Sequence, residues 1–392
     1  MNRVVLLCIV AVMLRVGAIV ISPGHFWAYT VYYDMAKVVA AGGGYCLSPG
    51  AMCAYFPPVY PTVLAACILT GHPMIAIMTA GALAGAGTVW LTFLIGRRLF
   101  GDTTGLVASA YATVYPYFVW HDAVLQETAT LTLVVAAAIY LLIWSRATMS
   151  RWLWLGAGAM LGLTVLTKAN LLLFVPFALA WTWLFGWRRV MWVTLGVALT
   201  LGPWVVRTWR ITGSPILYSN GGQALWASNH AQTFDYFPRK SIDDASEAEY
   251  ASLTAEDHRE INALNDANGI EEAQWYWNKG MEFIRANPGL TLKRAIYKVW
   301  IAFSPVFSPN KPGAFQFVYF LSYFPLLILA LAGAWVTRQR WRELGCIYML
   351  ILCFALGCAV LWGHTSHRMY VEPYLMILAA YFVSRRGYRN SE

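Results

Sequence analysis

The stretch Val4–Ile21, VVLLCIVAVMLRVGAIVI, is apolar apart from Arg15. A membrane-spanning helix needs about 20 predominantly apolar residues, so this stretch predicts a transmembrane helix at the start of the chain. Met1–Ser22 has the length of a secretory signal peptide. However, Arg15 interrupts its apolar core and no small-residue cleavage site follows. We therefore interpret the segment as a retained span.

The rest of the chain is similarly apolar. Of its 392 residues, 59% are hydrophobic and 12% are charged, and the mean hydropathy is +0.53. Soluble domains carry about 25% charged residues, so much of this chain must face lipid or other spans. The apolar runs are continuous, whereas the strands of a membrane β-barrel alternate. The composition predicts an all-α polytopic membrane protein.

The basic residues orient this predicted bundle. The formal net charge is +9, but Arg and Lys occur in short clusters between apolar runs, which is typical of cytoplasmic loops. We therefore expect contact with membrane lipid and no nucleic-acid partner. The clusters placed in the cytoplasm are Arg3, Arg97/Arg98, Arg146/Arg151, Arg188/Arg189, Arg338/Arg340/Arg342 and Arg385/Arg386/Arg389.

One membrane topology places every basic cluster, and both termini, on the cytoplasmic side. It predicts about ten transmembrane helices, near 4–22, 74–95, 105–120, 127–145, 152–168, 170–187, 190–206, 317–336, 344–362 and 369–384. The segment Pro57–Leu69 is short and proline-rich, so we interpret it as a juxtamembrane or re-entrant helix. If it were a span, the orientation of everything after it would be inverted.

This predicted topology divides the chain into three regions. Residues 1–206 form a membrane bundle with a first outer loop at 23–73, residues 207–297 form a helical extracytoplasmic loop, and residues 298–392 contain an interfacial helix and the last three spans. Within the loop, Ala245–Asn265 and Glu271–Ala286 predict helices, and Asn287-Pro288-Gly289 ends the second. Leu290–Phe307 mixes basic and aromatic residues, as interfacial helices do.

Two cysteines lie outside the spans, in the first outer loop. Cys46 and Cys53 would face an oxidising compartment, where a disulfide can form. Two free thiols are the alternative, and the chain carries no zinc-binding cysteine pattern.

Polar residues gather on the predicted outer face, where they would be costly unless they served a function. They are Asp34 in the first loop, His121, Asp122 and Glu127 in the second, Lys168 at the end of the fifth span, Arg207 and Arg210 after the seventh, and His364, His367 and Arg368 in the last outer loop. A carboxylate opposite several cations suits the transfer of a group from a phosphate to a hydroxyl. The carboxylate accepts the hydroxyl proton, and the cations stabilise charge on the departing phosphate.

Each candidate also has a structural interpretation. Asp34 could be a solvated acid paired with Lys37, and Glu127 could pair with a cation instead of orienting an acceptor. Lys168 and Arg207 could reach lipid headgroups. His364 and His367 form a His-x-x-His pattern, which is a weak metal signal in a loop, so we expect no metal and no other cofactor. Arg15 would pair with a carbonyl or an acid.

The order of motifs resembles the membrane glycosyltransferases of the GT-C fold. In particular, it resembles the protein O-mannosyltransferase and aminoarabinose-transferase group, often called glycosyltransferase family 39. The resemblance spans nearly the whole chain, and the series is more specific than any single motif. Its parts are Asp34; Gly42-Gly43-Gly44-Tyr45; Ala54-Tyr55-Phe56-Pro57-Pro58-Val59-Tyr60-Pro61; Gly96–Gly101; Tyr115-Pro116 with Glu127; Gly162-Leu163 with Leu166-Thr167-Lys168; Pro203-Trp204 with Arg207; Ser219-Asn220-Gly221-Gly222 with Leu225-Trp226 and Asn229; Ile284–Pro288; and His367-Arg368-Met369-Tyr370 with Pro373.

The resemblance implies an all-helical fold with a catalytic aspartate in its first outer loop. It also implies a polyprenyl-phosphate sugar as donor, transfer on the outer face of the cytoplasmic (inner) membrane, and an acceptor hydroxyl on a glycan, lipid or protein. By position, Asp34 would be the base, and Lys168 and Arg207 would face the lipid phosphate, with Arg210 and Arg368 as further phosphate candidates. Glu127 and Asp122 are the other candidate carboxylates. The acceptor or secondary candidates are His121, Tyr55, Tyr60, His364 and His367.

Two other functions fit a polytopic membrane protein. A transporter or flippase for a lipid-linked or polar solute is the main alternative. Such proteins often contain paired repeats and interrupted helices at the membrane midplane, and this sequence has neither. A lipid-binding or assembly protein without catalysis is the third.

Overall fold

The structure is a computed structural model that describes residues 2–27, 30–148, 150–234, 249–264, 269–306, 313–361, 363 and 365–389. In these residues all regular structure is helical, apart from an isolated bridge between Ser48 and Ala51. The prediction of an all-α polytopic membrane protein is confirmed.

Several described helices are long and apolar enough to cross a membrane. They are α1 (Asn2–Ile21), α5 (Pro73–Phe100), α8 (Thr128–Arg146), α11 (Trp187–Thr212) and the stretch Gly313–Val360, which contains α17 (Gly313–Thr337) and α18 (Trp341–Val360). The remaining predicted spans also contain helices, namely α9 (Arg151–Thr167), α10 (Phe174–Trp183) and α19 (Glu372–Arg389). The short helix α4 (Val59–Ile68) lies in the segment predicted as juxtamembrane.

Two predicted spans differ from the observed helices. The predicted span 105–120 is two helices, α6 (Asp102–Val114) and α7 (Pro116–Asp122), separated by Tyr115 in an extended conformation. Pro116 explains the break, because proline disfavours helical geometry in the preceding residue and starts a new helix well. The predicted span 170–187 begins with a 3₁₀ turn, η1 (Ala169–Leu173), before α10.

Small residues allow close helix packing in the bundle. A Cβ on Gly158 of α9 would collide with the backbone of Val193 in α11, and one on Gly196 of α11 would collide with the backbone of α9. Gly162, one turn after Gly158, lies against the side chain of Thr200 in α11. Membrane helices lack a hydrophobic drive to associate, so such close backbone approach stabilises the pair.

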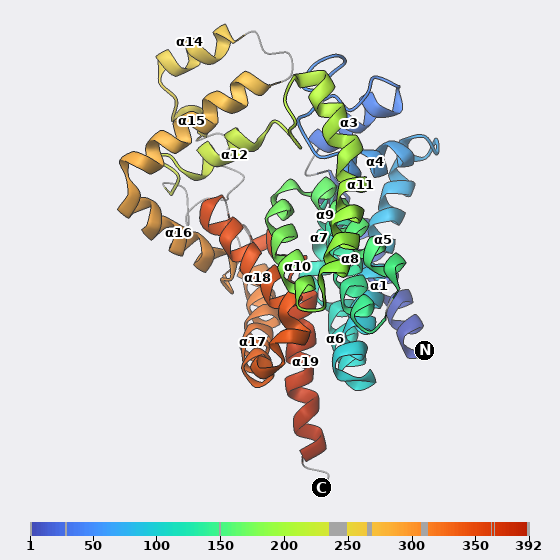
Figure 1. The fold of residues 1–392 in the computed structure, drawn as a ribbon. Helices are drawn as coiled ribbons and strands as arrows, with labels where there is room; N and C mark the ends of the chain where they lie inside the picture. Colours follow the sequence, from blue (N-terminus) through green and yellow to red (C-terminus); the bar gives the residue numbers. More distant parts are fainter. Residues whose placement is uncertain are drawn as a thin grey trace.

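The helices outside the bundle form a cap at one end of the molecule (Figure 1). The cap contains α12 (Gly221–Ser228), α14 (Ala255–Ala263), α15 (Ile270–Ala286) and α16 (Pro288–Ala302), and the first outer loop with α3 (Val31–Ala40) lies at the same end. The helix predicted at Glu271–Ala286 is confirmed as α15. The helix predicted at Leu290–Phe307 is found in α16 as far as Ala302, and Phe307 lies outside the described residues. The predicted helix Ala245–Asn265 contains α14, which starts at a capping box between Thr254 and Asp257. Residues 245–248 and 265 of that prediction lie outside the described residues.

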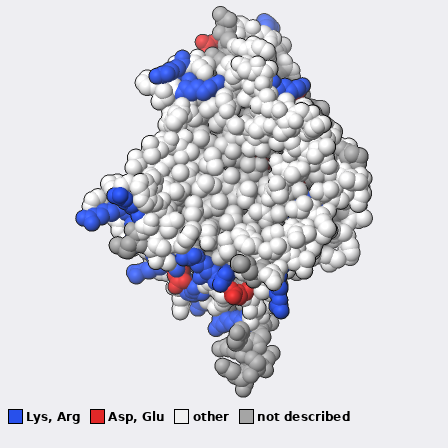
Figure 2. Space-filling model, turned by 90° about the vertical axis from the view of Figure 1, so that its right-hand side faces the viewer, with Lys and Arg blue, Asp and Glu red and all other residues white. Residues whose placement is uncertain are grey.

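Charged residues are unevenly distributed over the visible surface. Figure 2 shows most of the Lys and Arg residues near the upper and lower ends, with a broad surface between them that is largely free of charge. Large apolar side chains such as Leu6, Ile75 and Leu331 are exposed on the described surface. An exposed apolar belt of this kind suits contact with the hydrocarbon core of a bilayer. The division of the chain at residues 206 and 297 stays a prediction.

Candidate functional site

Asp34 lies on the exposed face of α3. Its Oδ1 is 2.7 Å from Nζ of Lys37, and both side chains are about half exposed, at 50% and 56%. The next two residues, Met35 and Ala36, are buried and lie on the opposite face of the helix. The predicted meeting of Asp34 with Lys168 and Arg207 is therefore not observed, because each of the three has another partner.

Lys168 pairs instead with Glu127. Glu127 immediately precedes α8 and Lys168 immediately follows α9. These two helices are consecutive and pack side by side, so the start of one lies near the end of the other. The Lys168 Nζ is 2.9 Å from Glu127 Oε1, and the side chains are only 17% and 14% exposed. Of the pairings that the sequence left open for Glu127, the one with a cation is observed.

Aromatic residues from the first outer loop surround this ion pair. Tyr32 of α3 lies near the Glu127 carboxyl group, and its ring lies 5.2 Å from Tyr60 and 4.5 Å from Phe56. The Lys168 charge and the hydrogen bond from its Nζ compensate the Glu127 carboxylate in a mostly buried site.

Tyr32 was missed by the sequence analysis. It lies two residues before Asp34, and a helix turns by about 100° per residue, so the two side chains leave α3 in nearly opposite directions. A helical projection of Val31–Ala40 would have separated the two faces. It would not have shown which face turns toward Glu127.

Arg207 lies against the first outer loop. Its Nη1 donates a hydrogen bond of 3.0 Å to the carbonyl of Cys53, and its guanidinium lies over the rings of Tyr45 and Trp204. Cys53 is disulfide-bonded to Cys46, so of the two alternatives that the sequence left open, the disulfide is observed. Arg210 is exposed. The structure thus places Arg207 where it anchors the outer loop.

Asp122 belongs to the bundle core. Its Oδ2 accepts a hydrogen bond of 2.7 Å from Nε of Arg15, and both side chains are buried, at 4% and 0% exposure. A Cβ on Gly85 would collide with both groups, so glycine leaves the space that this pair fills. The expectation that Arg15 pairs with an acid or a carbonyl is confirmed. Asp122 is occupied by this structural contact.

Arg368 is also buried in the bundle. It donates to Glu372 at 2.9 Å, to the carbonyl of Ala302 at 2.7 Å and to the Tyr319 hydroxyl at 2.6 Å, and its guanidinium is 3.5 Å from the centre of the Tyr323 ring. These partners belong to α16, α17 and α19. The side chain therefore joins three helices. It does not occupy the open position that a phosphate-binding residue needs.

The remaining candidates lie in several places. Nδ1 of His121 is 2.8 Å from Nε2 of Gln126, and its ring lies beside Tyr117. Tyr60 is buried in α4, and the Tyr55 hydroxyl donates to Gln223 of α12. His367 is half-buried in the 3₁₀ turn η4 (Thr365–Arg368). His364 lies outside the described residues.

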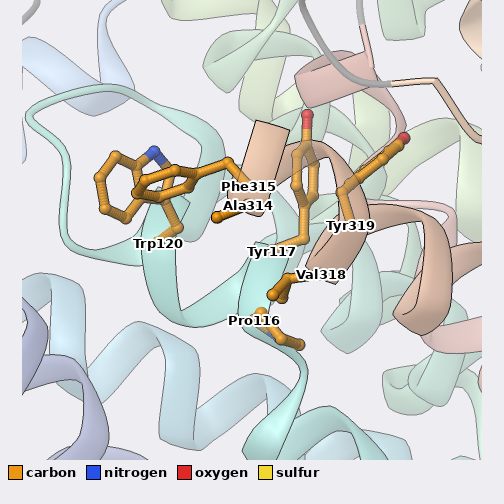
Figure 3. A pocket seen from close by; sticks show the side chains of 7 residues that line it. All are labelled: Pro116, Tyr117, Trp120, Ala314, Phe315, Val318 and Tyr319. Carbon is orange, nitrogen blue, oxygen red and sulfur yellow. The ribbon is translucent and has the colours of Figure 1, made fainter. Parts of the chain in front are cut away.

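An apolar pocket of about 220 Å³ opens beside α7. Its walls are side chains from α7 and the first turns of α17, as Figure 3 shows: Pro116, Tyr117, Trp120, Ala314, Phe315, Val318 and Tyr319. The Trp120 and Phe315 rings lie 5.2 Å apart, and so do those of Tyr117 and Tyr319. The chain runs from α7 through only a few residues to Glu127, so the pocket and the ion pair are joined by a short segment.

No group of three or more His, Cys, Asp and Glu side chains in the described ranges is arranged to hold a metal ion. The expectation that the protein needs no metal or other cofactor stays a prediction.

Comparisons with known proteins agree with this fold. Residues 56–209 match the family described as dolichyl-phosphate-mannose-protein mannosyltransferase. No curated protein sequence matches the chain. The archaeal oligosaccharyltransferase AglB from Archaeoglobus fulgidus, in complex with an inhibitory peptide and a dolichol-phosphate, is structurally similar with a TM-score of 0.59 at 12% identity. The similarity covers 99% of this chain and 52% of AglB.

Two further solved structures are similar. The apo form of the same Archaeoglobus fulgidus oligosaccharyltransferase has a TM-score of 0.58 at 13% identity, over 100% of this chain and 52% of that one. ArnT from Cupriavidus metallidurans, bound to undecaprenyl phosphate, has a TM-score of 0.47 at 16% identity, over 98% of this chain and 78% of ArnT. The chain thus spans about half the length of the oligosaccharyltransferase. The family match covers less than half of the chain. The helical bundle and the likeness to the oligosaccharyltransferase identify the chain as a polytopic membrane protein of the GT-C fold.

Proposed function

We propose that the protein is a membrane glycosyltransferase that moves a sugar from a polyprenyl-phosphate carrier to an acceptor hydroxyl. The observation that carries this proposal is the mostly buried pair of Glu127 and Lys168, which joins the ends of two neighbouring helices of a GT-C bundle. In a sugar transfer, the acceptor hydroxyl releases a proton and negative charge develops on the departing phosphate. An anionic group can accept the proton, and a cationic group held beside it can stabilise the negative charge. The fold similarity to an oligosaccharyltransferase in complex with a dolichol-phosphate supports a lipid-phosphate donor.

The two residues have complementary roles in this proposal. The donor phosphate attracts Lys168, whose charge stabilises the negative charge that develops on the leaving group. Separation from Lys168 removes the opposing charge from Glu127, so the carboxylate becomes a stronger base. Glu127 accepts the proton of the acceptor hydroxyl, and the oxygen of that hydroxyl bonds to the anomeric carbon of the sugar. The bond from that carbon to the phosphate oxygen breaks, and polyprenyl phosphate leaves with the electron pair.

Asp34 is not the base in this proposal. Its carboxylate pairs with Lys37 on the exposed face of α3, whereas Tyr32 on the other face lies near Glu127. Helix α3 therefore contributes Tyr32 to the reaction centre. The tyrosine orients the Glu127 carboxylate and limits the access of water to it.

The apolar pocket beside α7 would take part of the polyprenyl chain. Its lining is almost entirely carbon, and a prenyl chain offers only apolar surface (Figure 3). Burial of such surface is favourable by roughly 25 cal/mol per Å². The short connection from α7 to Glu127 suits a lipid whose phosphate lies near Lys168.

The reaction would take place on the outer face of the cytoplasmic membrane. Arg146 lies in the last turn of α8, at the opposite end from Glu127. Arg340 lies beside it, because both contact Glu343, and it also donates to the carbonyl of Leu99 at the end of α5. Such basic clusters favour the cytoplasmic side. The cap and the Glu127–Lys168 pair would then face outward.

A transfer assay tests the proposal. Purified protein in lipid vesicles would be given a panel of radiolabelled polyprenyl-phosphate sugars together with an extract containing candidate acceptors. We expect one donor to be consumed, with label appearing in a new glycosidic product and free polyprenyl phosphate released. Accumulation of an unmodified solute or lipid on one side of the vesicles, without bond formation, would instead establish a transporter or flippase.

A further inference from the structure

A second cavity lies between the first outer loop and the cap. It has a volume of about 140 Å³, less than the roughly 300–1,000 Å³ of sites for drug-sized ligands, so it suits a single small ring or group. Its walls combine residues from the first outer loop, the start of α12 and the first turns of α15. The polar and aromatic groups among them are Tyr55, Ser219, Asn220, Gln223, Glu272 and Tyr276.

The cavity wall is rigid. A Cβ on Gly222 of α12 would collide with the carbonyl of Ala273 in α15, so the two helices are in close contact. Trp226, Leu253 and Tyr276 form a small apolar cluster beneath them. The amide of Ser219 donates to the carbonyl of Ala54, which fixes α12 to the first outer loop. These contacts hold the polar side chains in place before a ligand arrives.

One buried polar atom of the cavity lining has no hydrogen-bond partner within the described residues. It is Oγ of Ser219, whose residue is 4% exposed. A buried polar group without a partner is costly. A ligand that supplies a hydroxyl group to the cavity would satisfy it.

The lining has the chemistry of a sugar-binding site. The amides of Asn220 and Gln223 can donate and accept, the hydroxyl of Ser219 can do both, and the carboxyl group of Glu272 accepts from sugar hydroxyls. Tyr55 and Tyr276 offer aromatic faces for the apolar side of a sugar ring. The carboxyl group of Glu272 disfavours a ligand that carries a phosphate or a carboxylate.

We propose that this cavity binds a saccharide unit of the acceptor, and that this unit is neutral or amine-bearing and not anionic. The inference rests on the proposed glycosyltransferase function for its place in the reaction. It adds the class of acceptor, a glycan, which the fold leaves open.

The cavity is connected to the Glu127–Lys168 pair in two ways. Along the first outer loop, the rings of Tyr55 and Phe56 are 4.7 Å apart, Phe56 packs on Tyr32, and Tyr32 lies near Glu127. On the other side, Tyr218 precedes the cavity residue Ser219, and its hydroxyl donates to Asn170, two residues after Lys168. A glycan held in the cavity would therefore extend past Tyr55 and Phe56 toward the reaction centre.

Direct binding tests this proposal without any donor. Saturation-transfer NMR on the purified full-length protein would use the methyl glycosides of mannose and glucosamine, mannose 6-phosphate, and a serine-rich peptide as probes. We expect at least one of the first two to bind and the phosphorylated sugar to bind at least tenfold more weakly. Glu272→Gln should weaken the binding by about tenfold, the loss expected for a hydrogen bond to a charged group.

Glu271→Gln is the matched control, because it removes the same charge from the exposed neighbouring residue of α15. If Glu272→Gln does not fold, Tyr55→Phe replaces it, since this change removes only the hydroxyl that reaches Gln223. Equal effects of the Glu271 and Glu272 changes, preference for mannose 6-phosphate, or binding of the peptide alone would overturn the inference. Lack of donor consumption by the wild-type protein would overturn the proposed function, while the saccharide binding would stand as measured.

Discussion

Oε1 of Glu127 lies 2.9 Å from Nζ of Lys168, and the two residues occupy the start of α8 and the end of α9. Each group compensates the charge of the other in a site that water reaches poorly. Such a pair contributes little net stability, but the loss of one partner leaves a buried charge uncompensated.

We predict that Lys168→Met destabilises the protein by about 3 to 5 kcal/mol, the usual cost of an unpaired buried charge. Glu127→Gln combined with Lys168→Met should recover much of this loss, because neither charge remains. Thermal unfolding of the single and double variants in detergent measures the coupling. Additive losses would mean that the two side chains act independently.

The cap should be less stable at higher pH because of Glu249. Burial, together with the nearby charge of Glu272, raises the pKa of Glu249 from 4.5 to about 8. Between these values the folded state holds a proton that the unfolded state has released, so stability falls as the pH rises through this window. The effect is at most about 5 kcal/mol, at 1.36 kcal/mol per pH unit.

Limited proteolysis of the cap at pH 5 and pH 8 measures this dependence. We expect faster cleavage at the higher pH in the wild-type protein and a flatter profile for Glu249→Gln. The same profile in both proteins would assign the pH dependence to other groups.

The first outer loop should respond to reducing agent. The disulfide between Cys46 and Cys53 closes the loop whose Cys53 carbonyl accepts the hydrogen bond from Arg207. Mass spectrometry should detect alkylation of these two cysteines only after reduction. Alkylation of both in the untreated, unfolded protein would show that they are free thiols.

The orientation of the bundle can be measured in intact cells. Glu256 is exposed in the cap helix α14, and Gln339 is exposed between α17 and α18 at the other end. An impermeant thiol reagent should therefore label Glu256→Cys and not Gln339→Cys. The opposite labelling pattern would place the cap in the cytoplasm.

Most of the fold could be predicted from the sequence, because the apolar runs and their basic flanks are local features. The clearest difference between the predicted and the observed helices is the break at Tyr115-Pro116. The run 105–120 is apolar throughout, and hydropathy alone does not register that a proline interrupts the helix there.

The site was harder to predict, because pairing depends on which helices are neighbours and which way a face turns. The spacing of Asp34 and Lys37 on one helix made their pair visible in the sequence. The Arg15–Asp122 and Arg368–Glu372 contacts, by contrast, remove two candidates that looked equally suitable as isolated charges. Only the packing of α8 against α9 and the rotation of α3 single out Glu127, Lys168 and Tyr32.

The most direct test of the proposed reaction centre compares two carboxylate variants in the vesicle assay for sugar transfer. Loss of a general base costs roughly 100- to 10,000-fold in rate. The structure predicts this loss for Glu127→Gln, whereas Asp34→Asn should retain transfer within a few-fold of the wild-type rate because Asp34 is exposed and paired with Lys37. Full transfer activity in Glu127→Gln, with loss of activity in Asp34→Asn, would contradict the account and restore Asp34 as the base.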